Sequence, residues 1–293
     1  MLKLKRVWEG ERMKSSNPIA LFDSGVGGLT VTKEVMNEFP DEDVIHFGDT
    51  LHLPYGPRPQ KEVRGFAFEI IDYLIEILNV KLIIIACNTA TAAALKIAQD
   101  KFEVPIIGPV KPGAKAAIKK TKNQKIGVIA TKGTISSKAY HKEIKLLSKE
   151  VEIFAKACPE FVTLVERGKV TGLEVEEVVE GYLASLREVG VDTLLLGCTH
   201  FPYLSQVIQK VIGPDVNLIY PGREMAIQAR EILSALDDLN KQPKIGSRTF
   251  YVSDLDNISY DFVKVGREFL GLDELQFKEL PIFDKPNLTQ GIK

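Results

Sequence analysis

The sequence has little that would place it in a membrane, on a nucleic acid or outside the cell. Its longest apolar runs are short, as at residues 82–87, whereas a membrane-spanning helix needs about 20 apolar residues. Lys and Arg number 38 against 39 Asp and Glu, so the net charge of −1 gives no excess of basic residues for binding nucleic acid or an anionic membrane. Residues 1–16 lack the apolar segment of a secretory signal. We therefore expect a cytoplasmic protein without a nucleic-acid or membrane partner.

Cysteine is also scarce. The three cysteines, Cys87, Cys158 and Cys198, are an odd number and too few for a disulfide framework, so we expect reduced thiols. They form no C-x-x-C pair, and His52 and His141 fall at no obvious metal-ligand spacing. The sequence thus predicts no metal site.

The composition and the apolar pattern indicate an α/β fold. Apolar residues make up 45% of the 293 and charged residues 26%, as in ordinary globular proteins large enough for about two domains. Short apolar runs alternate with amphipathic stretches such as 63–78 and 174–189, a pattern typical of parallel sheets covered by helices. The predicted strands are 19–22, 44–47, 82–86, 105–107, 126–130, 151–155, 193–197, 217–220 and 249–252.

Three pairs of residues that follow predicted strands share nearly the same spacing along the chain. The pairs are Asp23 and Thr131, 108 residues apart, Asp49 and Cys158, 109 apart, and Cys87 and Cys198, 111 apart. This spacing predicts two pseudo-symmetric, doubly wound parallel-sheet domains. Because ligands bind beyond the carboxyl ends of parallel strands, the active site is expected in the cleft between the domains. We place the first domain at 18–113 plus 221–282 and the second at 114–220, with a disordered leader at 1–17 and a tail at 283–293.

Cys87 and Cys198 are the candidate reactive groups. Each follows a predicted strand and precedes a helix, whose N-terminus is expected to lower the pKa of a thiol at that position. A single cysteine there is more simply a small buried apolar residue. Two cysteines at matched positions are harder to explain by packing alone. Cys158, which precedes Pro159, is interpreted as structural.

Loops rich in glycine and hydroxyl side chains follow other strands. Residues 23–28 and 131–134 offer backbone N–H groups and hydroxyls to an anion, and 54–56 offers a turn with free amides. Each is also explained as an ordinary helix cap or loop. Glu166 would not be selected from its own pattern.

Taken together, these motifs closely resemble those of the glutamate racemase family, in order from about residue 18 to beyond 220. The combination of Cys-Asn-Thr-Ala with Gly-Cys-Thr-His-Phe-Pro is highly specific. The matching segments are Asp23-Ser24-Gly25-Val26-Gly27-Gly28-Leu29-Thr30, Pro54-Tyr55-Gly56, Ala86-Cys87-Asn88-Thr89-Ala90, Thr131-Lys132-Gly133-Thr134, Ala157-Cys158-Pro159 with Glu166, and Gly197-Cys198-Thr199-His200-Phe201-Pro202.

The resemblance implies an enzyme that interconverts L- and D-glutamate without a cofactor and supplies D-glutamate for bacterial peptidoglycan. It implies that Cys87 takes the proton from D-glutamate and Cys198 takes it from L-glutamate. Asp23 would support Cys87, while His200 and Glu166 would support Cys198. The residues that the resemblance assigns to substrate binding are Asp23, Ser24, Asn88, Thr89, Thr131, Thr134, Thr199 and His200, with the amides of Tyr55 and Gly56.

Two alternatives remain open from the sequence. The first is a racemase of another acidic amino acid such as aspartate, although His200 stands where aspartate-type relatives tend to carry a carboxylate. The second is a non-catalytic anion-binding protein on the same fold. A homodimer and an activating cell-wall precursor are open as partners besides glutamate.

Overall fold

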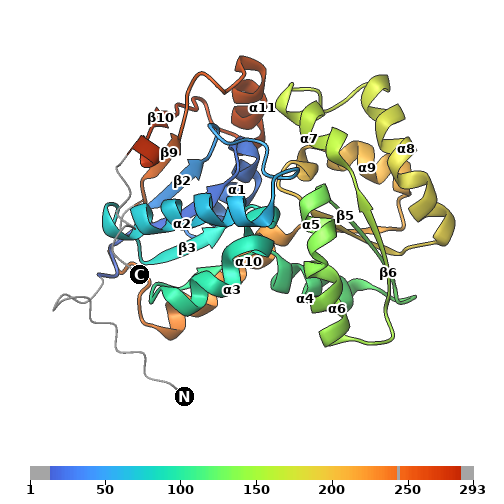
Figure 1. The fold of residues 1–293 in the computed structure, drawn as a ribbon, viewed down its shortest axis with the longest axis horizontal. Helices are drawn as coiled ribbons and strands as arrows, with labels where there is room; N and C mark the ends of the chain where they lie inside the picture. Colours follow the sequence, from blue (N-terminus) through green and yellow to red (C-terminus); the bar gives the residue numbers. More distant parts are fainter. Residues whose placement is uncertain (1–13, 243–244, 285–293) are drawn as a thin grey trace.

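A computed structural model of the chain describes residues 14–242 and 245–284, which form two parallel sheets lying side by side (Figure 1). The first sheet has the order β10-β9-β2-β1-β3-β4. Its strands are β1 (Ile19–Asp23), β2 (Val44–Gly48), β3 (Leu82–Ile85), β4 (Ile106–Ile107), β9 (Arg248–Val252) and β10 (Lys278–Glu279). Every residue of β1 and β3 is buried, which is why these strands read as continuous apolar runs.

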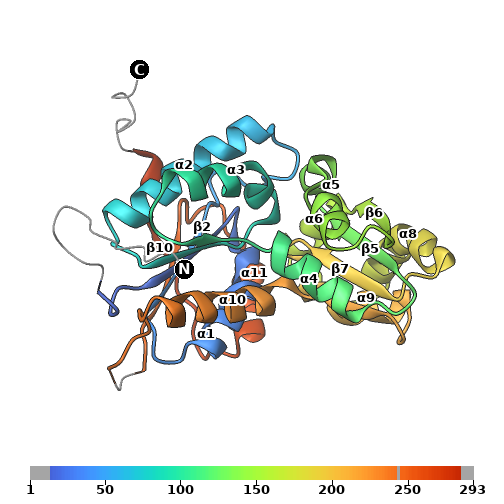
Figure 2. The ribbon, with the colours of Figure 1, turned by 90° about the horizontal axis from the view of Figure 1, so that it is seen from below.

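Helices cover both faces of the first sheet (Figure 2). One face packs against α2 (Gln60–Glu76) and α3 (Asn88–Lys101). The other packs against α1 (Leu29–Glu38) and α10 (Pro221–Ala235). Because α10 follows the strands of the second sheet in the chain and packs against the first sheet, the chain returns to the first sheet at about residue 221.

The second sheet has the order β6-β5-β7-β8. Its strands are β5 (Lys125–Ala130), β6 (Glu152–Ala157), β7 (Thr193–Gly197) and β8 (Asn217–Ile219). One face packs against α4 (Val110–Lys120) and α6 (Ala139–Leu147), and the other against α8 (Leu173–Val189) and α9 (Ser205–Ile212). The remaining elements are α5 (Lys132–Ser137), α7 (Pro159–Glu166), α11 (Tyr260–Leu270), η1 (Val26–Gly28), η2 (Phe201–Leu204) and η3 (Ile282–Asp284).

The two halves share one strand order, which confirms the predicted pseudo-symmetric fold. The order β2-β1-β3-β4 in the first sheet corresponds to β6-β5-β7-β8 in the second. The near-constant spacing in the sequence therefore reflects equivalent strand ends. In each half the order reverses between the first and third strands, which is where ligands bind in doubly wound sheets.

Some features differ from the sequence prediction or lie outside it. Strand β10 was not predicted, because two residues carry no periodic signal. Helix α4 spans the predicted boundary at 113/114 and packs against the second sheet, and the exact domain boundaries stay predictions. Of the predicted leader, residues 1–13 lie outside the described residues, as do residues 285–293 of the tail. Phe283 in the described part of the tail contacts the rings of His52 and Phe66.

In the described part of the chain, no helix combines the length and the apolar character needed to cross a membrane.

Candidate active site

The two cysteines singled out in the sequence lie at equivalent places in the two halves. Cys87 follows β3 and caps α3, where its sulfur accepts a hydrogen bond from the backbone N–H of Ala90 at 3.4 Å. Cys198 follows β7. The two residues are 5% and 6% exposed, and both line one cavity. The third cysteine, Cys158, is fully buried within a hydrophobic cluster, as expected of a structural residue.

The cavity shared by the thiols, called here the cleft cavity, has a volume of about 210 Å³ and is lined from both halves. Most of the predicted site residues line it: Ser24, Tyr55, Gly56, Cys87, Asn88, Thr89, Thr131, Cys198, Thr199 and His200. The other three, Asp23, Thr134 and Glu166, lie outside the lining, and each is hydrogen-bonded to a residue in it. The structure therefore brings all the predicted site residues to one place.

Asp23 connects the turn after β1 to the turn after β7. It is fully buried; its Oδ2 accepts from Gly28 N at 2.9 Å and from the Thr199 hydroxyl at 3.2 Å. Burial raises the pKa of Asp23 to about 6, although the charge of His200 and these hydrogen bonds oppose the rise. A carboxyl group with this pKa can hold or release a proton near neutral pH.

His200 forms a chain with Cys198 and Glu166. Its Nδ1 lies 3.7 Å from Cys198 Sγ, and its Nε2 lies 2.5 Å from Glu166 Oε1. Burial alone lowers the pKa of His200, but its hydrogen bonds and charge interactions with Cys198 and Glu166 raise it well above the ordinary value. A protonated imidazole donates from both nitrogens, one toward the sulfur and the other toward the carboxylate.

Hydroxyl groups gather where α3 meets α5. The Thr89 hydroxyl lies 2.9 Å from that of Thr131 and 3.3 Å from that of Thr134. Thr131 is the N-cap of α5 and accepts from the backbone N–H of Thr134 at 3.3 Å. Asn88 accepts from the Tyr140 hydroxyl at 2.6 Å through its side-chain oxygen, which leaves its amide nitrogen free to donate. These groups suit a bound carboxylate or ammonium.

The segment that contains Tyr55 and Gly56 is anchored on both sides. The Tyr55 hydroxyl donates to the buried Asp49 carboxylate at 2.5 Å, within the first half. Gly133 N donates to Gly56 O at 3.0 Å, from the second half. A Cβ on Gly133 would lie 2.8 Å from that same oxygen, so the close approach of the two loops requires glycine there.

The sequence prediction about the acidity of Cys87 is wrong. Burial raises the pKa of the Cys87 thiol to about 12, and the negative charge of Asp23 adds to the rise. The hydrogen bonds from Ala90 N and the Ser24 side chain oppose it but are outweighed. Cys87 lies at the N-terminus of α3 as predicted, but the free-energy cost of burying the thiolate away from water exceeds the stabilisation that the helix N-terminus gives it. Cys87 therefore carries its proton at neutral pH in this structure.

The sequence analysis assigned no site role to the side chains of several other residues that line the cleft cavity. Leu53, Pro54, Pro57, Pro159, Val162 and Thr163 add mostly apolar walls, and Lys132 adds a cation. Lys132 is exposed, and it is the one Lys or Arg lining this cavity among residues 14–242 and 245–284. Its place inside Thr131-Lys132-Gly133-Thr134 was the available signal. Over the same residues, no group of three or more His, Cys, Asp or Glu side chains gathers as a metal site would require.

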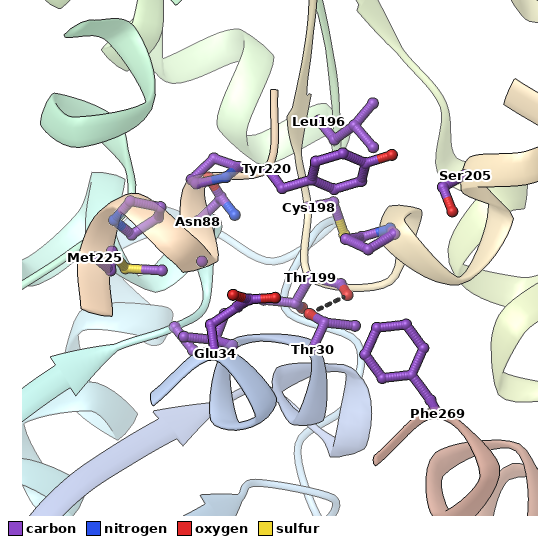
Figure 3. A pocket seen from close by; sticks show the side chains of 16 residues that line it. Thr30, Glu34, Asn88, Leu196, Cys198, Thr199, Ser205, Tyr220, Met225 and Phe269 are labelled. Carbon is purple, nitrogen blue, oxygen red and sulfur yellow. Dashed lines mark hydrogen bonds between the residues drawn. The ribbon is translucent and has the colours of Figure 1, made fainter. Parts of the chain in front are cut away.

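A second cavity, called here the rear cavity, also has a volume of about 210 Å³. It shares Asn88, Cys198 and Thr199 with the cleft cavity, so these three residues contribute to both. Figure 3 shows its wall, where side chains of α1, including Thr30 and Glu34, face Cys198, Thr199 and Tyr220. The turn that carries Cys198 therefore lines both the cleft cavity and the rear cavity.

The chain is similar to known racemases. The model of the family described as Asp/Glu/Hydantoin racemase matches residues 27–229. A glutamate racemase of Exiguobacterium sibiricum is 50% identical over 222 residues, 76% of this chain and 80% of the relative. Glutamate racemase from Francisella tularensis, solved in complex with D-glutamate, has a TM-score of 0.84 at 34% identity and covers 92% of this chain and 100% of its own. Escherichia coli glutamate racemase, solved with L-glutamate and the activator UDP-MurNAc-ala, has a TM-score of 0.72 at 27% identity over 86% of this chain and 95% of its own.

The fold, the site and these relatives define an amino-acid racemase, a class of isomerase. The chain belongs to the Asp/Glu/hydantoin racemase family.

Proposed function

We propose that this chain interconverts L- and D-glutamate, with Cys87 and Cys198 as the two acid–base groups. The observation that carries the proposal is the pair of buried thiols at equivalent strand ends, both lining one cavity. The relatives named glutamate racemase support glutamate as the substrate.

The reaction explains why two thiols are needed. Inverting the α-carbon requires one group to remove the α-proton from one face and another to deliver a proton to the opposite face. For L-glutamate, the Cys198 thiolate takes the α-proton as the C–H bond breaks, and a carbanion forms at the α-carbon. The Cys87 thiol then gives its proton to the other face, which yields D-glutamate, a Cys87 thiolate and a Cys198 thiol. The reverse reaction exchanges the roles.

The groups beside the two thiols suit their roles in the conversion of L-glutamate. The raised pKa of Cys87 keeps its proton available for delivery, whereas a protonated His200 beside Cys198 provides a cation for a thiolate. A reactive cysteine next to a histidinium is a common means of activating a thiol. Glu166 in turn holds the imidazolium through its Nε2 proton.

The carbanion needs stabilisation that the thiols do not supply. The hydroxyl and amide donors at Ser24, Asn88, Thr89 and Thr131 can hold the α-carboxylate as negative charge develops in a buried site. The substrate ammonium, placed near Asp23, would add a positive charge near Cys87 and so offset the cost of ionising that thiol. This arrangement assigns the work to side chains and substrate, without pyridoxal phosphate.

The biological setting follows from the product. D-glutamate is a component of bacterial peptidoglycan, so we assign this chain to the supply of that precursor in the cytoplasm. A homodimer and activation by a cell-wall precursor stay predictions for this chain, although the Escherichia coli relative has been solved with such an activator. Adding the precursor to the assay described below tests the second of these.

The test is proton NMR of L- and, separately, D-glutamate with the full-length protein in D₂O without added cofactor. We expect the α-proton signal to disappear and chiral analysis to detect the other enantiomer. Cys87→Ala and Cys198→Ala should each lower turnover by roughly 10²- to 10⁴-fold, as expected for loss of an acid–base group. Cys158→Ala is the matched control and should retain turnover, since this cysteine does not line the cavity.

Other results would replace the proposal. A higher kcat/KM for aspartate than for glutamate would make the chain a racemase of that amino acid. Binding of glutamate without α-proton exchange would make it an anion-binding protein. Near-normal turnover in Cys87→Ala or Cys198→Ala would refute the two-thiol mechanism while leaving the substrate assignment intact.

A further inference from the structure

The turn that carries Cys198 and His200 contains a backbone carbonyl without its usual donor. In this tight turn, Phe201 N donates to Cys198 O at 3.2 Å and Tyr203 N donates to His200 O at 3.2 Å. The same spacing would give Thr199 O the N–H of residue 202. That residue is Pro202, which has no N–H. The backbone of this turn therefore offers no N–H donor to the carbonyl of Thr199.

Thr30 supplies the missing hydrogen bond from the other half of the molecule. Its hydroxyl lies 2.9 Å from Thr199 O, closer than the 3.2 Å to Gly27 O in the preceding turn, and Figure 3 shows the bond to Thr199 at the wall of the rear cavity. Thr30 is on α1, which packs against the first sheet, and it is 5% exposed. Buried carbonyls are nearly always paired, so this contact meets a need that Pro202 creates.

The partner of Thr30 is a residue on which the proposed chemistry depends. Thr199 stands between Cys198 and His200, and its own hydroxyl donates to Asp23. The turn is thus held from the first half at two atoms, the Thr199 hydroxyl and the Thr199 carbonyl. Because Cys87 also belongs to the first half, these two bonds link the turn of Cys198 to the half that carries Cys87.

We propose that Thr30 is a positioning residue of this racemase, whose hydroxyl replaces the N–H that Pro202 lacks and so fixes Cys198 and His200 opposite Cys87. This inference rests on the proposed two-thiol mechanism. In this proposal Thr30 does not contact the substrate. Loss of the Thr30 hydroxyl is therefore expected to lower kcat and to leave substrate binding unchanged.

The first test compares two Thr→Val substitutions, each of which removes one buried hydroxyl group. Thr30→Val deletes the hydroxyl while keeping the shape of the side chain, and we expect kcat to fall roughly 10- to 100-fold, as for a small misplacement of a reacting group. Thr91→Val is the matched control, because Thr91 is also 5% exposed and its hydroxyl also donates to a backbone carbonyl, that of Ile85 at 3.2 Å, but within one half. Thr30→Ser keeps the hydroxyl and should restore turnover. Equal kcat values for Thr30→Val and Thr91→Val would overturn the proposal.

The second test supplies the missing donor by another route. Pro202→Ala gives residue 202 an N–H at the spacing that serves the neighbouring carbonyls. Thr30→Val should therefore cost less turnover in the Pro202→Ala background than in the wild-type background. Equal losses in the two backgrounds would show that the Thr199 carbonyl is not where Thr30 acts. If Thr30→Val folds poorly by itself, kcat of the Thr30→Val, Pro202→Ala double variant is compared with that of Pro202→Ala alone, and a loss of roughly 10-fold or more would overturn the proposal.

An isotope effect separates a displaced thiol from a general structural defect. In the proposed mechanism Cys198 removes the proton of L-glutamate, so its displacement slows that step. In Thr30→Val the primary isotope effect on kcat/KM should rise for 2-deuterated L-glutamate and fall for 2-deuterated D-glutamate. Unchanged isotope effects would refute the positioning role. Absence of racemisation in the wild-type protein and in Thr91→Val would instead refute the proposed function.

Discussion

Asp23→Asn is expected to make the protein more stable above pH 6 relative to wild type. Asp23 is fully buried, with Gly28 N and the Thr199 hydroxyl as donors. An asparagine can keep both contacts, because its side-chain oxygen accepts from Gly28 N and its amide can donate to the Thr199 oxygen. The substitution therefore removes a buried charge at little cost in hydrogen bonding.

The magnitude follows from the raised pKa of Asp23. The native value is about 6 against 3.8 for the unperturbed group, so the folded state binds this proton more tightly than the unfolded state does. The stabilising contribution of the protonated carboxyl is complete below pH 3.8 and is lost as the pH rises through 6. The difference between the two pKa values corresponds to about 3 kcal/mol. Of this, about 2 kcal/mol should be lost between pH 4 and pH 8.

The assay is urea unfolding of wild type and Asp23→Asn at a series of pH values, followed by circular dichroism. The free energy of unfolding of the variant minus that of wild type should rise by about 2 kcal/mol from pH 4 to pH 8, with most of the rise below pH 6. Taking the difference at each pH cancels groups that titrate alike in both proteins. A difference that stays constant, or that falls as pH rises, would refute the assignment of a buried, raised-pKa carboxyl to Asp23.

Two further substitutions test how the site and the first half are held. Gly27→Ala would place a Cβ 2.5 Å from Nδ1 of His200, so the ring must move and turnover should fall roughly 10²-fold. Gly65→Ala is the control, because a Cβ there has nothing within 4 Å, and it should leave kcat unchanged. Similar kcat values for the two variants would contradict the tight contact between Gly27 and His200. Lys81→Met removes the partner of Glu42 from a buried ion pair of 2.5 Å and should cost about 3–5 kcal/mol of unfolding free energy. Replacing Glu42 by Gln in the same chain should recover part of that loss in urea unfolding, and an additive double variant would show that the pair does not interact.

Much of the fold could be predicted because its signals are local. Strands such as β3 and β7 are buried on both faces, and a continuous apolar run marks them, four residues long in β3 and three in β7. The spacing between equivalent strand ends predicted the two halves, and the observed strand orders agree. Strand β10 could not be predicted, because it is paired only through its position beside β9.

The structure gathers the expected site residues around one cavity, and their roles stay predictions. The position of Cys87 and Cys198 at strand ends singled out these two residues, since the topology of parallel sheets brings such ends together, and the family resemblance supplied the others. The acidity of Cys87 was predicted with the wrong sign, because a helix N-terminus is visible in a sequence and the depth of burial is not. Glu166 carried no signal of its own and was expected only from the family resemblance; the structure places its carboxylate against His200.

The sequence by itself determined most of the strands, the residues that follow them, and the presence of two similar halves. The strands depend on side-chain period over a few residues, and the two halves are visible in a spacing of 108 to 111 residues between equivalent strand ends. Only the tertiary structure decided the proton affinities of Asp23 and Cys87 and the bond from Thr30 to Thr199, between residues 169 positions apart. Desolvation and cross-half hydrogen bonding exist only once the two halves have packed together, so no local pattern can encode them separately.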